Sequence, residues 1–164
     1  MSKTFFVLKG AQLNSFYEKG LRFTCQEGCR YCCAVEPGFV FLSEEDIKKL
    51  SDYLKVNEKE FVLNYCREVP FGSISYISLK ERQNHDCIFL GDKGCNVYLA
   101  RPIQCVTYPF WSSVVSSEER WLDEKQWCPG IDVGNLFKES EIQNFLKMRE
   151  AHLPALWSEV VNGK

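Results

Sequence analysis

The sequence of 164 residues lacks several features that define common protein classes. No apolar run approaches the roughly 20 residues that a membrane-spanning helix needs. The first residues lack the continuous apolar stretch of a secretory signal. Acidic and basic residues nearly balance, at 22 and 20, so the basic excess typical of nucleic-acid or anionic-membrane binding is missing. We therefore expect a cytoplasmic protein that binds neither nucleic acid nor membrane.

Motifs of conventional enzymes are missing as well. The sequence has no phosphate-binding loop, no Ser-His-Asp set and no paired-carboxylate motif, so it does not support kinase or hydrolase chemistry. Only two histidines occur. His152 falls in an expected helix and indicates a structural role, while His85 and Asp86, directly before Cys87, are typical of a surface turn. The catalytic residues, if there are any, stay unknown at this point.

Cysteine is the residue type in excess, with nine in the chain. Four of them fall within the nine residues "CQEGCRYCC". In a reducing cytoplasm such cysteines are more often metal ligands than disulfide partners, and the odd count and the adjacency of Cys32 and Cys33 also oppose bridges. Cys66 stands alone and fits a small buried apolar residue. The other eight form two blocks: Cys25, Cys29, Cys32 and Cys33, then Cys87, Cys95, Cys105 and Cys128.

These eight cysteines predict a metal centre. Thiolates are soft ligands that suit zinc and iron–sulfur clusters. Four of them complete a tetrahedral zinc site or a four-iron cluster. Gathering so many thiols without a metal would crowd negative charge in a poorly hydrated place, and a bound ion or cluster removes that penalty and adds folding free energy. We expect all eight cysteines to be metal ligands.

The spacing favours an iron–sulfur cluster over zinc, although both stay open. Structural zinc sites usually have two separated Cys-x2-Cys knuckles, whereas this chain has one dense block and four scattered cysteines. Cys128 is followed by Pro129, as is the last ligand of bacterial ferredoxin runs. Eight ligands also suit two separate sites.

Local patterns outside the cysteines predict short strands and several helices. Ser43 and Asp46 form a capping-box pattern that begins one helix, and Asn57 begins a second, which Pro70 and Gly72 end. The remaining predictions are a short strand over 39–42, a strand-like stretch over 74–90, a tight turn over 91–94, a polar strand or loop over 112–122, a helix from Lys138 and another opened by Pro154.

Together these patterns predict the fold class α+β. We expect a single domain over residues 1–164, small, irregular and rich in cysteine, built around a metal core. The cysteine-cluster core spans about residues 23–130, and a C-terminal helical segment of about 138–162 covers it.

The order of these motifs resembles the YkgJ-type cysteine-cluster family, which carries the CxxCxxCC pattern and is described as "putative zinc- or iron-chelating". The resemblance covers about residues 23–130, and the chain has three residues, where family members often have two, between the first two cysteines. The matching positions are Phe23 and Cys25, Cys32-Cys33, Cys87-Ile88-Phe89-Leu90, Cys95 with Tyr98, Arg101-Pro102 with Cys105, and Pro109-Phe110.

The resemblance implies a metal- or cluster-binding protein with a role in redox chemistry, in metal handling or as accessory to a modifying enzyme. It extends to the cysteine-rich part of flagellin lysine methylases, but this chain has no recognisable S-adenosylmethionine motif of its own. One alternative is a zinc-stabilised module that binds a protein partner without catalysis. A second is a small radical S-adenosylmethionine enzyme, because Cys25-x3-Cys29-x2-Cys32 resembles the cluster motif of that class.

Overall fold

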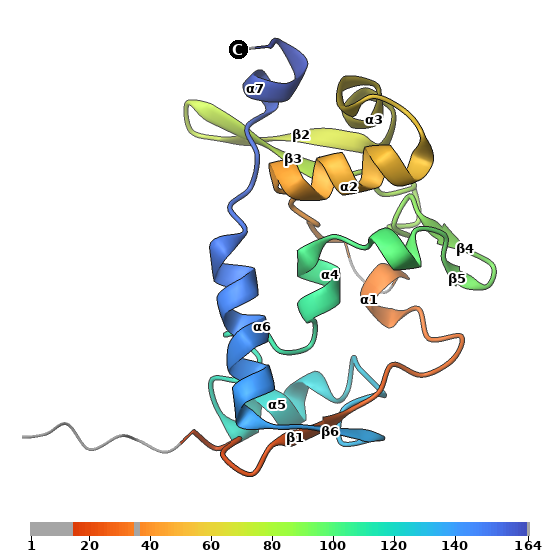
Figure 1. Ribbon diagram of the computed structural model, residues 1–164. Coiled ribbons are helices and arrows are strands. Elements are labelled where there is room, and N and C mark those ends of the chain that lie inside the picture. Colours follow the sequence, from red (N-terminus) through yellow and green to blue (C-terminus); the bar gives the residue numbers. More distant parts are fainter. Residues whose placement is uncertain (1–14, 35–36, 164) are drawn as a thin grey trace, which may run out of the picture.

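The computed structural model describes residues 15–34 and 37–163, and within them the fold is α+β, as predicted (Figure 1). The strands form three two-stranded antiparallel sheets, paired β1 with β6, β2 with β3, and β4 with β5. The elements in chain order are β1 (Leu21–Phe23), α1 (Tyr31–Ala34), α2 (Glu44–Leu54), α3 (Glu58–Tyr65), β2 (Cys66–Phe71), β3 (Ile74–Leu79), β4 (Leu90–Gly91), β5 (Gly94–Cys95), the 3-10 helix η1 (Tyr98–Ala100), α4 (Ile103–Thr107), α5 (Glu118–Glu124), β6 (Asn135–Phe137), α6 (Glu139–Ala151) and α7 (Trp157–Val161).

The buried apolar side chains form two clusters rather than one. The first core lies among α2, α3 and the β2–β3 hairpin, and the second lies among α5, α6, β1 and β6, at the opposite end of the molecule (Figure 1). Helices α1 and α4 lie between them. The first core comprises Leu42, Ile47, Leu50, Phe61, Val62, Cys66, Ile77, Leu79, Phe89, Val97, Ala100 and Ala155. The second core comprises Tyr17, Leu21, Phe110, Val114, Val115, Trp121, Cys128, Ile131 and Ile142.

Helices α2 and α3 begin where the caps predict. The Asp46 amide donates to the Ser43 hydroxyl at 3.1 Å and the Ser43 amide donates to the Asp46 carboxylate at 3.3 Å, which completes the capping box. The Glu60 amide donates to the Asn57 side chain at 2.8 Å at the start of α3. The predicted extension of this helix to Pro70 is wrong, because α3 ends at Tyr65 and the chain continues as β2.

The β2–β3 hairpin carries one face of the first core. Its strands pair from Cys66 with Leu79 to Phe71 with Ile74, and Gly72 opens the two-residue turn with a φ of +62°. The strand predicted over 39–42 contributes one bridge, between Phe41 and Ser78.

The second core is closed by segments that lie far apart in the chain. Strand β1 pairs with β6 in the register of Leu21 with Phe137. The prediction of a polar strand or loop over 112–122 is wrong for its last part, because α5 begins at Glu118. Ser117 caps this helix by accepting the Arg120 amide at 3.2 Å, and its Trp121 is buried in the second core.

The C-terminal helices cover the rest of the chain. Helix α6 packs against α4, and α7 packs against α3 and β3, so both cores receive residues from this segment (Figure 1). The second helix begins at Trp157, later than the position that Pro154 indicated. A single domain over residues 1–164 stays a prediction.

We expect Asp46→Ala to lower the free energy of unfolding by about 2–4 kcal/mol, because it leaves two buried amides without an acceptor. The Asp46 carboxylate is 2% exposed, caps α2, and accepts the Ile103 amide of α4 at 2.9 Å. Urea denaturation of the variant measures the loss. Asp52→Ala is the matched control on the same helix: within the described part of the chain the Asp52 carboxylate pairs with exposed Lys48 alone, so stability should hardly change. Equal effects of both substitutions would contradict this role of Asp46.

Candidate metal centre

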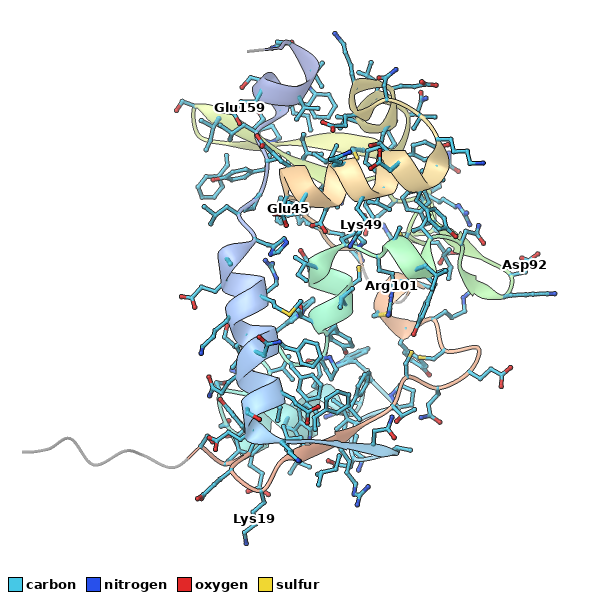
Figure 2. All side chains as sticks on the ribbon, in the orientation of Figure 1. Lys19, Glu45, Lys49, Asp92, Arg101 and Glu159 are labelled. Carbon is cyan, nitrogen blue, oxygen red and sulfur yellow. The ribbon has the colours of Figure 1, made fainter. Side chains whose placement is uncertain are left out.

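The cysteine-bearing segments meet between the two cores, around the single turn of α1 (Figures 1 and 2). Cys32 and Cys33 lie on this turn with their sulfur atoms 3.7 Å apart. The Cys33 carbonyl accepts the Cys87 amide at 2.7 Å, which fastens α1 to the segment before β4. Two sulfurs at this distance are in van der Waals contact, so α1 brings both thiols to the same part of the molecule.

Cys87 and Cys95 lie on either side of the tight turn that the sequence predicts at 91–94. Cys95 pairs with Leu90 across β4 and β5, and Gly94 takes a φ of +110°, which favours glycine. The sulfur of Cys87 accepts a hydrogen bond from the Phe89 amide, and that of Cys95 accepts one from the Val97 amide. In both cases the donor lies two residues after the cysteine, so the loop wraps its backbone around the sulfur.

Cys128 repeats the same arrangement near the other end of the site. Its sulfur accepts the Gly130 amide, again two residues later, and the Tyr108 side chain is hydrogen-bonded to the same sulfur. The Tyr108 hydroxyl also donates to Glu124 at 2.6 Å. The Thr24 amide donates to the Gly130 carbonyl at 3.1 Å, which brings the first block of cysteines next to Cys128.

The sulfurs lie close enough to influence one another's charge. Burial raises the pKa of five of these thiols, and neighbouring cysteines raise it further: Cys25, Cys87, Cys95, Cys105 and Cys128. Cys33 and Cys32 act as a pair in which a hydrogen bond from the Cys33 thiol lowers the pKa of Cys32 to about 7 and raises that of Cys33. Cys29 contributes to the pKa shifts of Cys25 and Cys128. The structure thus brings all eight predicted ligands into one region.

Arg101 supplies the positive charge of this region. It lowers the pKa of four thiols on both sides of the site: Cys25, Cys32, Cys95 and Cys105. Its guanidinium lies 3.7 Å from the centre of the Tyr98 ring, and its Nε donates to the Tyr98 carbonyl at 3.1 Å. Lys49 of α2 donates to the Arg101 carbonyl. These contacts hold the Arg101 guanidinium near the thiols. Its positive charge partly replaces the water that would stabilise a thiolate at an exposed site.

The donor set fits a soft metal, although the sulfurs do not yet converge on one point. Among residues 15–34 and 37–163, no three cysteine, histidine, aspartate or glutamate side chains meet as ligands of a single ion. Backbone amides aimed at three sulfurs and the Arg101 charge stabilise thiolates, which are the form that binds zinc or iron.

Cys66 does not belong to this region. It is 1% exposed in the first core, and burial alone raises the pKa of its thiol to about 12, opposed slightly by Lys80. This agrees with its interpretation as a small apolar residue.

Two residues near the cysteines have roles that the sequence did not indicate. Asp86 was expected in a surface turn, but it is 7% exposed and pairs with Arg30 at 3.3 Å, so the ion pair joins the Cys87 loop to the approach to α1. Tyr108 resembles any other aromatic residue in the sequence, and only the fold places its hydroxyl between Glu124 and Cys128. No local pattern could have found either contact.

We expect Cys32 to be alkylated fast, and Cys66 slowly, when the reduced, metal-free protein meets iodoacetamide near pH 7. A thiol with a pKa of about 7 is half ionised there, whereas a buried thiol with a pKa of about 12 is almost fully protonated. Mass spectrometry of peptides taken at successive times orders the thiols. Modification of Cys66 at the rate of Cys32 would contradict this division.

Comparison with known protein families also identifies the cysteine-rich part of the chain as a metal-chelating type of domain. The model of the CxxCxxCC family, described as "Putative zinc- or iron-chelating domain", matches residues 24–129, which is more than half of the sequence. The chain belongs to this family. The resemblance expected over about residues 23–130 is therefore confirmed.

A curated relative extends the match beyond the cysteine core. The chain is 25% identical over 150 residues to "Uncharacterized protein MJ0939" of Methanocaldococcus jannaschii. The match covers 88% of this chain but only 50% of that protein, so the chain spans half the length of this relative. No solved structure matches. In the described part of the chain, no helix is long and apolar enough to cross a membrane.

Proposed function

We propose that this CxxCxxCC-family protein binds iron or zinc through the thiolates of its two cysteine blocks. The observation that carries the proposal is the set of backbone amides directed at the sulfurs of Cys87, Cys95 and Cys128, each from two residues downstream. A neutral thiol is a weak acceptor and gains little from such donors, whereas a thiolate gains a charge-assisted hydrogen bond. Three loops built in this way are therefore suited to hold thiolates, and a metal compensates the remaining negative charge.

The proposal names the residues that hold the metal and the residue that balances it. The ligands are Cys25, Cys29, Cys32, Cys33, Cys87, Cys95, Cys105 and Cys128. Arg101 offsets part of the charge of an all-thiolate site and keeps its position through Tyr98. When bound, an iron–sulfur cluster supplies one-electron redox chemistry, whereas zinc supplies a redox-inert structural link.

We favour an iron–sulfur cluster over zinc. The proposed ligands come from the segment between β1 and α1, from α1 itself, from the stretch that leads into β4 and β5, from α4 and from the loop after α5. They therefore come from several parts of the chain, as ligands of a three-dimensional cluster do. The site also has an exposed edge, since Cys25 and Cys32 are exposed to solvent. We propose that the protein acts in the cytoplasm, in redox chemistry, in metal handling or as an accessory to a modifying enzyme. Each of these roles requires a protein partner or a metal donor.

Metal analysis and an absorption spectrum of protein purified without oxygen test the proposal. Brown protein with iron and acid-labile sulfide, bleached by dithionite, is the expected result. Colourless protein with stoichiometric zinc keeps metal binding and rejects the cluster. Protein that contains neither iron nor zinc, although folded and reduced, rejects the proposed function.

A zinc-stabilised interaction module is the second candidate, because the β2–β3 hairpin exposes aromatic side chains. Phe71, at the tip of the hairpin, is 70% exposed and packs beside Tyr76, while Phe39 and Phe41 stack with ring centres 5.5 Å apart. Redox titration separates the two candidates, since a zinc site has no one-electron step. The radical-enzyme alternative finds no support in the described residues, whose sheets are three antiparallel pairs and not a parallel barrel.

A further inference from the structure

Eight thiolates are more than one common metal centre uses. A structural zinc ion takes four protein ligands. A four-iron cluster likewise takes four cysteines. The eight cysteines that the structure gathers therefore exceed the capacity of a single ion or a single cluster of these kinds.

The backbone divides the eight cysteines into two sets, and the first faces the first core. Cys87 and Cys95 pack against that core; Cys95 pairs with Leu90, whose amide donates to the Cys87 carbonyl at 2.9 Å. Cys33 joins them through its carbonyl, which accepts the Cys87 amide at 2.7 Å. Cys105 lies on α4, whose first amide, that of Ile103, donates to Asp46 of α2 at 2.9 Å, so this helix is also fixed to the first core.

The second set faces the second core. Cys128 is one of the buried residues of that core. The chain after β1 runs beside it, because the Thr24 amide donates to the Gly130 carbonyl and Phe23 bridges to Ile131. Cys25 follows directly, and a turn in which the Cys29 amide donates to the Gln26 carbonyl at 3.1 Å leads to α1.

We propose that the cysteines form two four-thiolate centres: a first centre of Cys33, Cys87, Cys95 and Cys105, and a second centre of Cys25, Cys29, Cys32 and Cys128. This inference rests on the proposed function and deepens it. Each centre belongs to one core, and α1 contributes one cysteine to each, so binding of both metals ties the two cores together through a single helical turn. The 3.7 Å between the sulfurs of Cys32 and Cys33 places the two centres side by side.

Titration of the reduced, metal-free full chain with Co²⁺ tests the division, because each tetrahedral thiolate site adds its own charge-transfer and ligand-field absorption. The wild-type chain should saturate at two Co²⁺ ions, in keeping with four thiolates for each ion. The double variant C25S/C128S should saturate at one ion, and so should C87S/C95S. C66S is the matched control and should take up the same amount of Co²⁺ as the wild-type chain. Circular dichroism checks that each variant keeps its helices.

Several outcomes would overturn the inference. If the wild-type chain saturates at one Co²⁺ ion and C25S/C128S binds the same amount, the protein has one centre. The division into two centres is then wrong, and the proposed function stands. Loss of both ions from a folded C25S/C128S chain would indicate one shared centre. If C87S/C95S does not fold, the amounts of Co²⁺ bound by the wild-type chain and by C25S/C128S still distinguish two centres from one. Absence of any Co²⁺, zinc or iron binding by the wild-type chain would reject the proposed function as well.

Discussion

Stripping the metal from the reduced protein is expected to lower its melting temperature by about 10–20 °C. Binding to folded thiolates contributes about 10–16 kcal/mol in small zinc domains, and half of the lower value, about 5 kcal/mol, corresponds to this shift in a chain of this size. The effect should be large because the cysteines lie between two separate cores, each of which contains or contacts some of them. Differential scanning calorimetry with and without a strong chelator, under argon and with a reductant, measures it.

A cysteine that lies outside the site provides the control for this experiment. Cys66→Ala should bind as much metal as the wild-type protein and show the same drop on chelation, although its own core packing is weakened. C87S/C95S should start with a lower melting temperature and show a smaller drop on chelation than the wild-type protein, because it keeps the ligands of one centre. A wild-type melting temperature that chelation leaves unchanged would show that the thiols do not link the cores through a metal.

Phe110→Ala is expected to lower the free energy of unfolding by about 3–5 kcal/mol, the usual loss when a large aromatic side chain is removed from a core. Phe110 is 2% exposed and lies at the centre of the second core. Its ring centre lies 4.9 Å from that of Phe137, 5.4 Å from Phe145 and 5.8 Å from Trp121. Since these rings come from α5, β6 and α6, one cavity weakens the contact among three elements. Urea denaturation measures the change.

Phe71→Ala is the matched control for Phe110→Ala. Phe71 is the same residue type but 70% exposed at the end of β2, so its removal should change the unfolding midpoint far less. Similar losses for both variants would mean that the second core is not packed as the structure describes.

Elements with a local chemical cause could be predicted from the sequence. The capping box of Ser43 and Asp46 and the cap at Asn57 depend on residues a few positions apart, and both helices begin there. The tight turn over 91–94 depends on two glycines and was found in the same way.

Elements held by distant contacts could not be predicted. Strand β1 has three residues and exists because β6, from the other end of the chain, pairs with it. Helix α5 has seven residues and buries one of them, Trp121. A single buried side chain gives no repeat of apolar residues from which a helix could be predicted. Strand β2 contains Pro70, which predicts the end of a helix locally but pairs with Ser75 at the edge of a hairpin in the fold.

The same distinction applies to the site. The type and spacing of the cysteines predict a soft-metal site, because thiols so close together have few other uses. Which cysteine lies beside which depends on contacts such as that between the Cys87 amide and the Cys33 carbonyl, which only the folded chain shows. The fold alone shows that the charge of Arg101 lies near four of the thiols while its side chain is held by Tyr98.

X-ray absorption at the metal edge of the protein as purified tests the central claim most directly. The account predicts a first shell of sulfur alone, with about four sulfurs per metal at about 2.3 Å if the metal is zinc. For iron it predicts sulfur neighbours together with a short iron–iron distance. A shell made mainly of oxygen or nitrogen would contradict binding through the clustered cysteines.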